Sequence, residues 1–181
     1  CREPAAPLFV IWLNHWSIFM ADDVTDRTLS NEIVNFINSG GTLSEIYDLS
    51  SETLETIYEL GFKYYSAGLY KESESLFRFL CTFDHFSARN FFALGSCLHM
   101  QSQYQSALDA YSFSAILDSN DPRPPYYAGQ CHLMLGAKEQ AASGFYAASQ
   151  LKGKHSKYDK LCIEADTYYQ RLNMENEHGD Y

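Results

Sequence analysis

The fold is decided by residues 54–121, in which two consecutive stretches of equal length share one pattern. Residues 54–87 read LETIYELGFKYYSAGLYKESESLFRFLCTFDHFS, and residues 88–121 read ARNFFALGSCLHMQSQYQSALDAYSFSAILDSND. Residues 122–155 continue in the same register. Five columns recur at an interval of 34 residues: Gly61, Gly95 and Gly129; Gly68, Ser102 and Gly136; Tyr70 and Tyr104; Ser73, Ala107 and Ala141; Phe77, Tyr111 and Phe145.

This interval and these columns are typical of tetratricopeptide repeats, each a pair of antiparallel helices. A glycine inside a helix, such as Gly61, costs about 1 kcal/mol against alanine, so we expect the partner helix with Ser73 to approach it closely. Gly68 falls where the first helix must stop. The sequence therefore predicts an all-α solenoid of three helix-turn-helix repeats (54–87, 88–121 and 122–155) with capping helices at both ends.

Residues 20–53 are expected to form an N-terminal helical region. The polar stretch from Asp22 to Thr28 should be loose, and a helix should run from Ser30 until Gly40 and Gly41 end it. A capping box, Thr42-x-x-Glu45, then opens a short helix. The apolar residues of the longer helix share one face at i, i+4, i+7 and i+8: Leu29, Ile33, Phe36 and Ile37.

The two ends of the sequence differ from the repeats. Residues 1–19 contain an apolar run that resembles the core of a signal peptide, but it is shorter than the roughly 20 residues of a membrane span and lacks a clear cleavage motif. We interpret it as a non-native or disordered extension before a start at Met20, and an export signal is the alternative. Residues 156–175 should form a C-terminal capping helix, and residues 176–181 a polar tail.

Composition limits the possible functions. The chain has 181 residues, a formal net charge of −10 and no cluster of basic residues, which argues against nucleic acid as a partner. No apolar segment is long enough for stable insertion into a membrane. Five cysteines without a CxxC pair favour a reducing compartment without disulfides.

Catalytic signals are absent from the sequence. The six histidines are scattered without the spacing of a metal site, and no phosphate-binding or nucleophile motif occurs. His132 falls in a packing column and is expected to be a core residue. We therefore predict no enzyme activity, no metal and no cofactor.

The first helices of the repeats are expected to line the concave side of the stack. Beside the packing face of residues 54–66 lies a row of aromatic residues, and the 34-residue interval carries these positions into the next repeats. Large amphipathic rings suit an extended peptide, whereas the alternative is that they belong to the core. The predicted trough consists of Tyr58, Phe62 and Tyr65, then Phe92, Ser96 and His99, then Tyr126, Gln130 and Leu133.

Several motifs together resemble a known family. They are Gly40-Gly41-Thr42-Leu43, Tyr65-x-x-Gly68-x-Tyr70 and Asp121-Pro122-Arg123-x-Pro125, within a match over about residues 29–151. The sequence resembles the class II chaperones of bacterial type III secretion systems, the SycD/LcrH group. Lys138 departs from the pattern, because it stands where Tyr70 and Tyr104 stand in the earlier repeats.

The resemblance implies a cytoplasmic, non-enzymatic protein that keeps two hydrophobic translocator proteins soluble and apart before secretion. Such proteins bind an extended translocator segment in the concave trough, where Tyr58, Phe62 and Tyr65 match the family's aromatic positions. They also form homodimers through the N-terminal region, here the face with Phe36. The alternative is a general tetratricopeptide scaffold that joins two folded proteins without chaperoning either.

Overall fold

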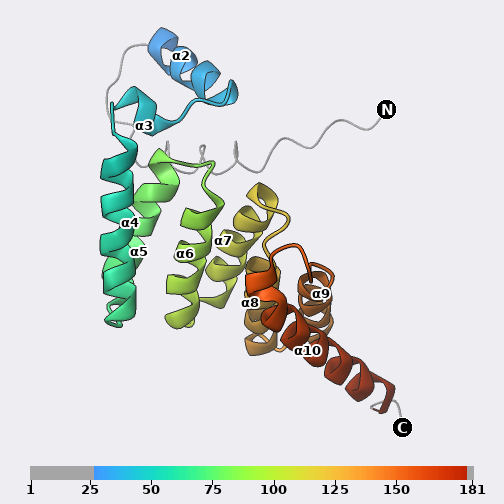
Figure 1. Ribbon diagram of the computed structural model, residues 1–181. Coiled ribbons are helices and arrows are strands. Elements are labelled where there is room, and N and C mark those ends of the chain that lie inside the picture. The colour runs from blue at the N-terminus through green and yellow to red at the C-terminus, as the bar shows by residue number, and fades with distance from the viewer. Residues whose placement is uncertain (1–26, 179–181) are drawn as a thin grey trace, which may run out of the picture. The chain divides into compact units, whose positions relative to one another are not determined.

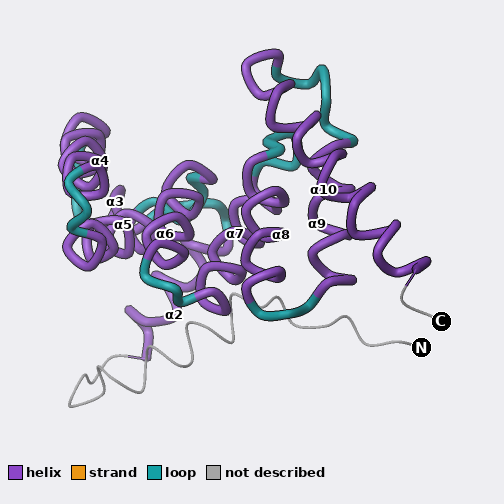
Figure 2. Tube along the Cα trace, turned by 90° about the horizontal axis from the view of Figure 1, so that it is seen from below, coloured by secondary structure: helices purple, strands orange, loops and turns teal. Residues whose placement is uncertain are grey.

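The computed structural model describes residues 27–178, with side chains for residues 33–174, and this part of the chain is helical without strands (Figure 2). The chain divides into two compact units, Cys1–Gly41 and Thr42–Tyr181. The described elements are α2 (Arg27–Asn38), α3 (Leu43–Ile46), α4 (Ser51–Ser66), α5 (Tyr70–Phe83), α6 (Ala88–Met100), α7 (Tyr104–Leu117), α8 (Arg123–Met134), α9 (Lys138–Ser149), the 3₁₀ turn η1 (Ser156–Tyr158) and α10 (Asp159–His178).

The second unit is a stack of helical hairpins. The pairs α4–α5, α6–α7 and α8–α9 follow one another in chain order, with α5 packed on α6 and α7 on α8 (Figure 1). The last helix, α10, packs on α9 and covers the end of the third hairpin. The predicted all-α tetratricopeptide solenoid is confirmed.

The first helix of each hairpin ends in the same way. A residue with positive φ comes directly after it, namely Gly68 at 78°, Ser102 at 60° and Gly136 at 75°. The next N–H then bonds back to a carbonyl five residues earlier, which is the Schellman pattern. These bonds are Leu69 to Tyr64, Gln103 to Leu98 and Ala137 to His132, each with an N···O distance of 2.9 Å.

The glycine column is explained by an aromatic ring on the second helix. A Cβ atom added at Gly95 would lie 2.7 Å from the Tyr111 ring, and one at Gly61 would lie 3.0 Å from the Phe77 ring. The sequence pointed instead to the small residue Ser73 as the place of close approach. Ser73 does donate a hydrogen bond to the Gly61 carbonyl oxygen at 2.8 Å, but the ring is what excludes a side chain.

Some predicted boundaries were wrong by a few residues. α2 begins at Arg27, so Thr28 is helical and not loose, and α8 begins at Arg123 instead of Pro122. The Asp121 carboxylate still accepts a hydrogen bond from the Arg123 backbone N–H at 2.9 Å. The predicted final helix is interrupted by η1, and α10 continues to His178 into the expected tail. The predictions for residues 1–19, for Asp22 to Asp26 and for the end of the tail at residues 179–181 lie outside the described residues.

In the first unit, α2 ends at a tight turn. The Phe36 ring packs where a Gly41 side chain would stand, and Gly40 has a φ of 96°. Ile33 and Ile37 are half-buried, whereas Val34 is 46% and Phe36 37% exposed. The side chain of Leu29 lies outside the described part of the helix.

Candidate peptide-binding site

A cavity of about 330 Å³ lies along the first helices of the three hairpins, α4, α6 and α8. We call it the aromatic cavity. Its wall includes two rows of the sequence-predicted trough, one from α4 and one from α6, together with one residue from α8. The predicted residues that line it are Tyr58, Phe62, Tyr65, Phe92, Ser96, His99 and Gln130.

Tyr126 and Leu133 do not line this cavity, so their predicted positions in the trough were wrong. Tyr126 is only 4% exposed, and its hydroxyl donates a hydrogen bond to Glu164 of α10 at 2.7 Å. Its ring packs edge-on against Phe145 with centroids 5.6 Å apart. Leu133 packs against the same buried cluster. The cause is α10, which covers in the third hairpin the face that a following hairpin would occupy.

Tyr127, the neighbour of Tyr126, takes its place in the wall, and sequence reasoning missed it. Its ring lies 5.7 Å from Phe92 and 6.0 Å from Tyr111, measured between centroids. Arg123 was also missed as a wall residue, although it belongs to the Asp-Pro-Arg motif at the start of the third repeat. The signal that could have found Arg123 is its position 34 residues after Arg89.

The floor of the cavity is buried and uncharged at neutral pH. Tyr111 is 1% exposed, and its hydroxyl lies 3.5 Å from Nδ1 of His99. Burial lowers the pKa of His99 and raises the pKa of Tyr65 and of Tyr111, so the neutral form of each is favoured. The floor therefore offers apolar surface with hydrogen-bonding groups but no net charge.

Two arginines cover aromatic rings of the preceding hairpin. The guanidinium carbon of Arg89 lies 3.4 Å from the centroid of Tyr58, and that of Arg123 lies 4.4 Å from the centroid of Phe92. Each arginine has a carboxylate partner, Glu55 for Arg89 and Asp121 for Arg123. Such cation–π contacts fix the ring positions at this edge.

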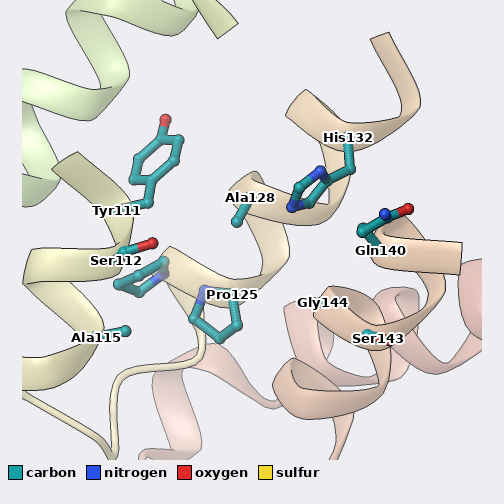
Figure 3. A pocket seen from close by; sticks show the side chains of 10 residues that line it. Tyr111, Ser112, Ala115, Pro125, Ala128, His132, Gln140, Ser143 and Gly144 are labelled. Carbon is teal, nitrogen blue, oxygen red and sulfur yellow. The ribbon is translucent and has the colours of Figure 1, made fainter. Parts of the chain in front are cut away.

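A second cavity, of about 410 Å³, lies among α7, α8 and α9 (Figure 3). Ser112 and Ala115 reach it from α7, and Ser143 from α9, with Ala128 and His132 of α8 between them. Most of these side chains are small, so this cavity offers little ring surface to hold an apolar anchor. It contains none of the residues of the predicted trough.

The described residues contain no cluster of histidine, cysteine or acidic side chains that could hold a metal ion. Among them, no helix combines the length and the apolar character that crossing a membrane requires. Cys97 and Cys131 are fully buried, and burial raises the pKa of each thiol to about 11. These thiols therefore pack as small apolar side chains, as the sequence predicted.

Comparison with known proteins places the chain first in a general class and then in a family. Residues 91–121 match the family model described as a tetratricopeptide repeat. The chain is also 33% identical over 143 residues to low calcium response locus protein H of Yersinia pestis, an alignment that covers 79% of this chain and 85% of the relative.

Solved structures give the same result. The Yersinia enterocolitica type III secretion translocator chaperone SycD, solved as an alternative dimer, is 32% identical with a TM-score of 0.67 and covers 71% of this chain and 98% of its own. PcrH of Pseudomonas aeruginosa in complex with the chaperone binding region of PopD is 38% identical with a TM-score of 0.69, covering 71% and 96%. PcrH with the corresponding region of PopB is 41% identical with a TM-score of 0.64, covering 66% and 97%. The chain belongs to this family of type III secretion translocator chaperones, which are not enzymes.

Proposed function

We propose that this protein is a cytoplasmic chaperone that binds two hydrophobic translocator proteins of a type III secretion system and keeps them soluble before secretion. It does so by holding an extended segment of each translocator in the aromatic cavity. The observation that carries the proposal is this cavity on the fold of a translocator chaperone. Support for two cargoes comes from PcrH, which has been solved with segments of both PopD and PopB.

The chemistry of the cavity suits an apolar anchor on the cargo. Phe62 is 57% and Met100 50% exposed, which is unusual for large apolar side chains that line a concavity. Burying these surfaces against a cargo side chain is favourable, and the polar floor groups can meet the cargo backbone. Because binding removes the exposed segment from solution, it lowers the concentration of the aggregating species by mass action.

Charge supports the role of a solubilising partner. The formal net charge of −10 would keep a complex with an apolar cargo in solution and would favour cargo with basic flanking residues. The affinity should be moderate, because an extended segment loses conformational entropy when it binds. Moderate affinity also allows release at the secretion apparatus.

The N-terminal unit is proposed to form a homodimer. The apolar face of α2 contains Ile33, Phe36 and Ile37, and the exposure of Phe36 leaves apolar surface for a second copy. The dimer of SycD supports this proposal. Replacing both Phe36 and Ile37 with aspartate should give a folded monomer by light scattering, and an unchanged mass would contradict it.

The binding proposal can be tested with a matched pair of surface phenylalanines. Phe62 (57% exposed) lines the aromatic cavity, whereas Phe86 (51% exposed) does not. Labelled peptides tiling the N-terminal region of the cognate translocators are titrated into wild type, Phe62→Ser and Phe86→Ser. We expect one segment to bind with a micromolar Kd, and Phe62→Ser alone to weaken binding about tenfold or more. No binding segment, or equal losses in both variants, would contradict the proposal and favour a general scaffold.

A further inference from the structure

Arg123 is an unusual wall residue for the aromatic cavity. It is the first residue of α8, where the partial positive charge of the helix N-terminus disfavours a cation. Asp121 compensates, because Nε of Arg123 donates to both carboxylate oxygens at 3.0 Å and Nη2 donates to one of them. The chain thus maintains a neutralised guanidinium group at the edge of an otherwise apolar cavity.

Aromatic rings further restrict this guanidinium group. Its central carbon lies 4.4 Å from the centroid of Phe92 and 4.8 Å from that of Tyr158, which belongs to η1. Rings from two separate elements and the Asp121 carboxylate therefore hold the group in place. Because the side chain is already ordered, a further hydrogen bond to it would cost little conformational entropy.

The arginine retains unused donors. A guanidinium group has five N–H bonds, two of them on Nη1. Within the described part of the chain, Nη1 of Arg123 has no hydrogen-bond partner, since all the side-chain bonds to Asp121 come from Nε and Nη2. A preorganised donor beside the cavity is therefore available to a ligand.

We propose that Nη1 of Arg123 donates to a main-chain carbonyl oxygen of the bound cargo segment and so fixes the register of that segment beside the aromatic cavity. This inference rests on the proposed function. An extended segment presents one carbonyl group per residue, so the contact would not require a particular cargo side chain. A carboxylate is a poorer match, because Asp121 already balances the charge and the protein is acidic overall.

Arg89 supplies a matched control, since it occupies the equivalent position one repeat earlier and also covers an aromatic ring. Its Nη1 and Nη2 both donate to Glu55, at 2.8 and 2.9 Å, and it does not line the aromatic cavity. Replacing either arginine with lysine keeps the positive charge and an acidic neighbour but removes the planar donor group.

The test uses the full chain and the binding segment found with the tiled translocator peptides. Wild type, Arg123→Lys and Arg89→Lys are titrated with this peptide and with versions in which single backbone amides are replaced by esters, whose carbonyl oxygens are weaker acceptors. We expect Arg123→Lys to weaken binding about tenfold and Arg89→Lys less than about twofold. One ester should weaken binding to wild type about fivefold or more but hardly affect Arg123→Lys.

The outcomes separate this inference from the proposed function. If wild type binds and Phe62→Ser loses binding, but Arg123→Lys binds as wild type does, the inference is wrong while the function stands. Ester effects of equal size in wild type and Arg123→Lys would also overturn it. So would a loss in Arg123→Lys that is reproduced only by removing a cargo carboxylate. If no segment binds to wild type, both proposals fail. Circular dichroism confirms that the variants are folded.

Discussion

The second and third hairpins place aromatic residues at equivalent positions with different results. Phe92 of α6 lines an open cavity, whereas Tyr126 of α8, in the same register, is 4% exposed beneath α10. The opposite side of these helices does not differ in this way, since Gly95 and Gly129 each pack against a buried aromatic ring. The packing side of the repeat is thus preserved, while the exposure of the other side depends on the element that comes next in the chain.

This difference shows that register determines the direction of a side chain but not its exposure. The face of α6 remains open because the next hairpin packs beside it, while the face of α8 is closed by Tyr168 and Glu164 of α10. The chaperone therefore has a binding surface that belongs mainly to its first two hairpins. Substitutions on the open and closed faces can test this division.

The largest expected effect is on stability, from truncation of the closed position. Tyr126→Ala should lower the free energy of unfolding by about 3–5 kcal/mol, because it leaves a cavity in a buried cluster. Urea denaturation monitored by circular dichroism measures this change. The equivalent Tyr58→Ala should cost much less, since Tyr58 is half-buried beside the open cavity. Equal losses would contradict the division between open and closed faces.

The packing side should respond to an added methyl group according to the distance to the ring. At Gly95 a Cβ would lie 2.7 Å from Tyr111, so Gly95→Ala should destabilise the protein by about 1–3 kcal/mol. At Gly61 the distance to Phe77 is 3.0 Å, and the gain in helix propensity of about 1 kcal/mol should nearly offset the crowding. Thermal denaturation of both variants checks the order, and a more stable Gly95→Ala would contradict this packing.

The packing columns made most of the fold predictable from sequence. Glycine at 61, 95 and 129 has a local cause that repeats every 34 residues, so the helices and their turns could be placed from it. Tyr126 could not be placed in the same way, because its burial depends on α10, which lies outside the repeat pattern. Arg123 was missed because its role depends on contacts with Phe92 and Tyr158, which are distant in sequence.

A smaller effect is expected at the turn between α6 and α7. Ser102 has a φ of 60°, whereas glycine occupies the equivalent position in the first and third hairpins. The left-handed conformation is strained for a residue with a Cβ, so Ser102→Gly should stabilise the protein by about 0.5–1 kcal/mol. Gly136→Ala should destabilise it by about 1 kcal/mol. A rise in Tm for the first and a fall for the second are the expected signs, and reversed signs would contradict the strain.

The smallest expected effect is the pH dependence of stability from the cavity floor. Burial lowers the pKa of His99, so the unfolded chain binds its proton at a higher pH than the folded chain. This contribution to stability is complete above the ordinary histidine pKa of about 6.5 and is lost as the pH falls from there towards the folded pKa.

Unfolding of wild type and His99→Gln at pH 7.5 and 5.5 measures this contribution. The variant should lose less stability on acidification, whereas His155→Gln, at an exposed position, should behave as wild type does. His85 and His132, whose pKa values burial also lowers, remain in both proteins and supply a common background. Identical slopes for wild type and His99→Gln would show that the cavity floor is open to water.

The most direct test of the open face is site-specific photocrosslinking in the assembled complex. A benzophenone amino acid is placed at residue 62, in the aromatic cavity, or at residue 86, which has similar exposure outside it. Each chaperone is co-expressed with a translocator, irradiated and analysed by mass spectrometry. We predict that residue 62 crosslinks to one short translocator segment and residue 86 does not. Crosslinks at residue 86 with none at residue 62 would contradict the account.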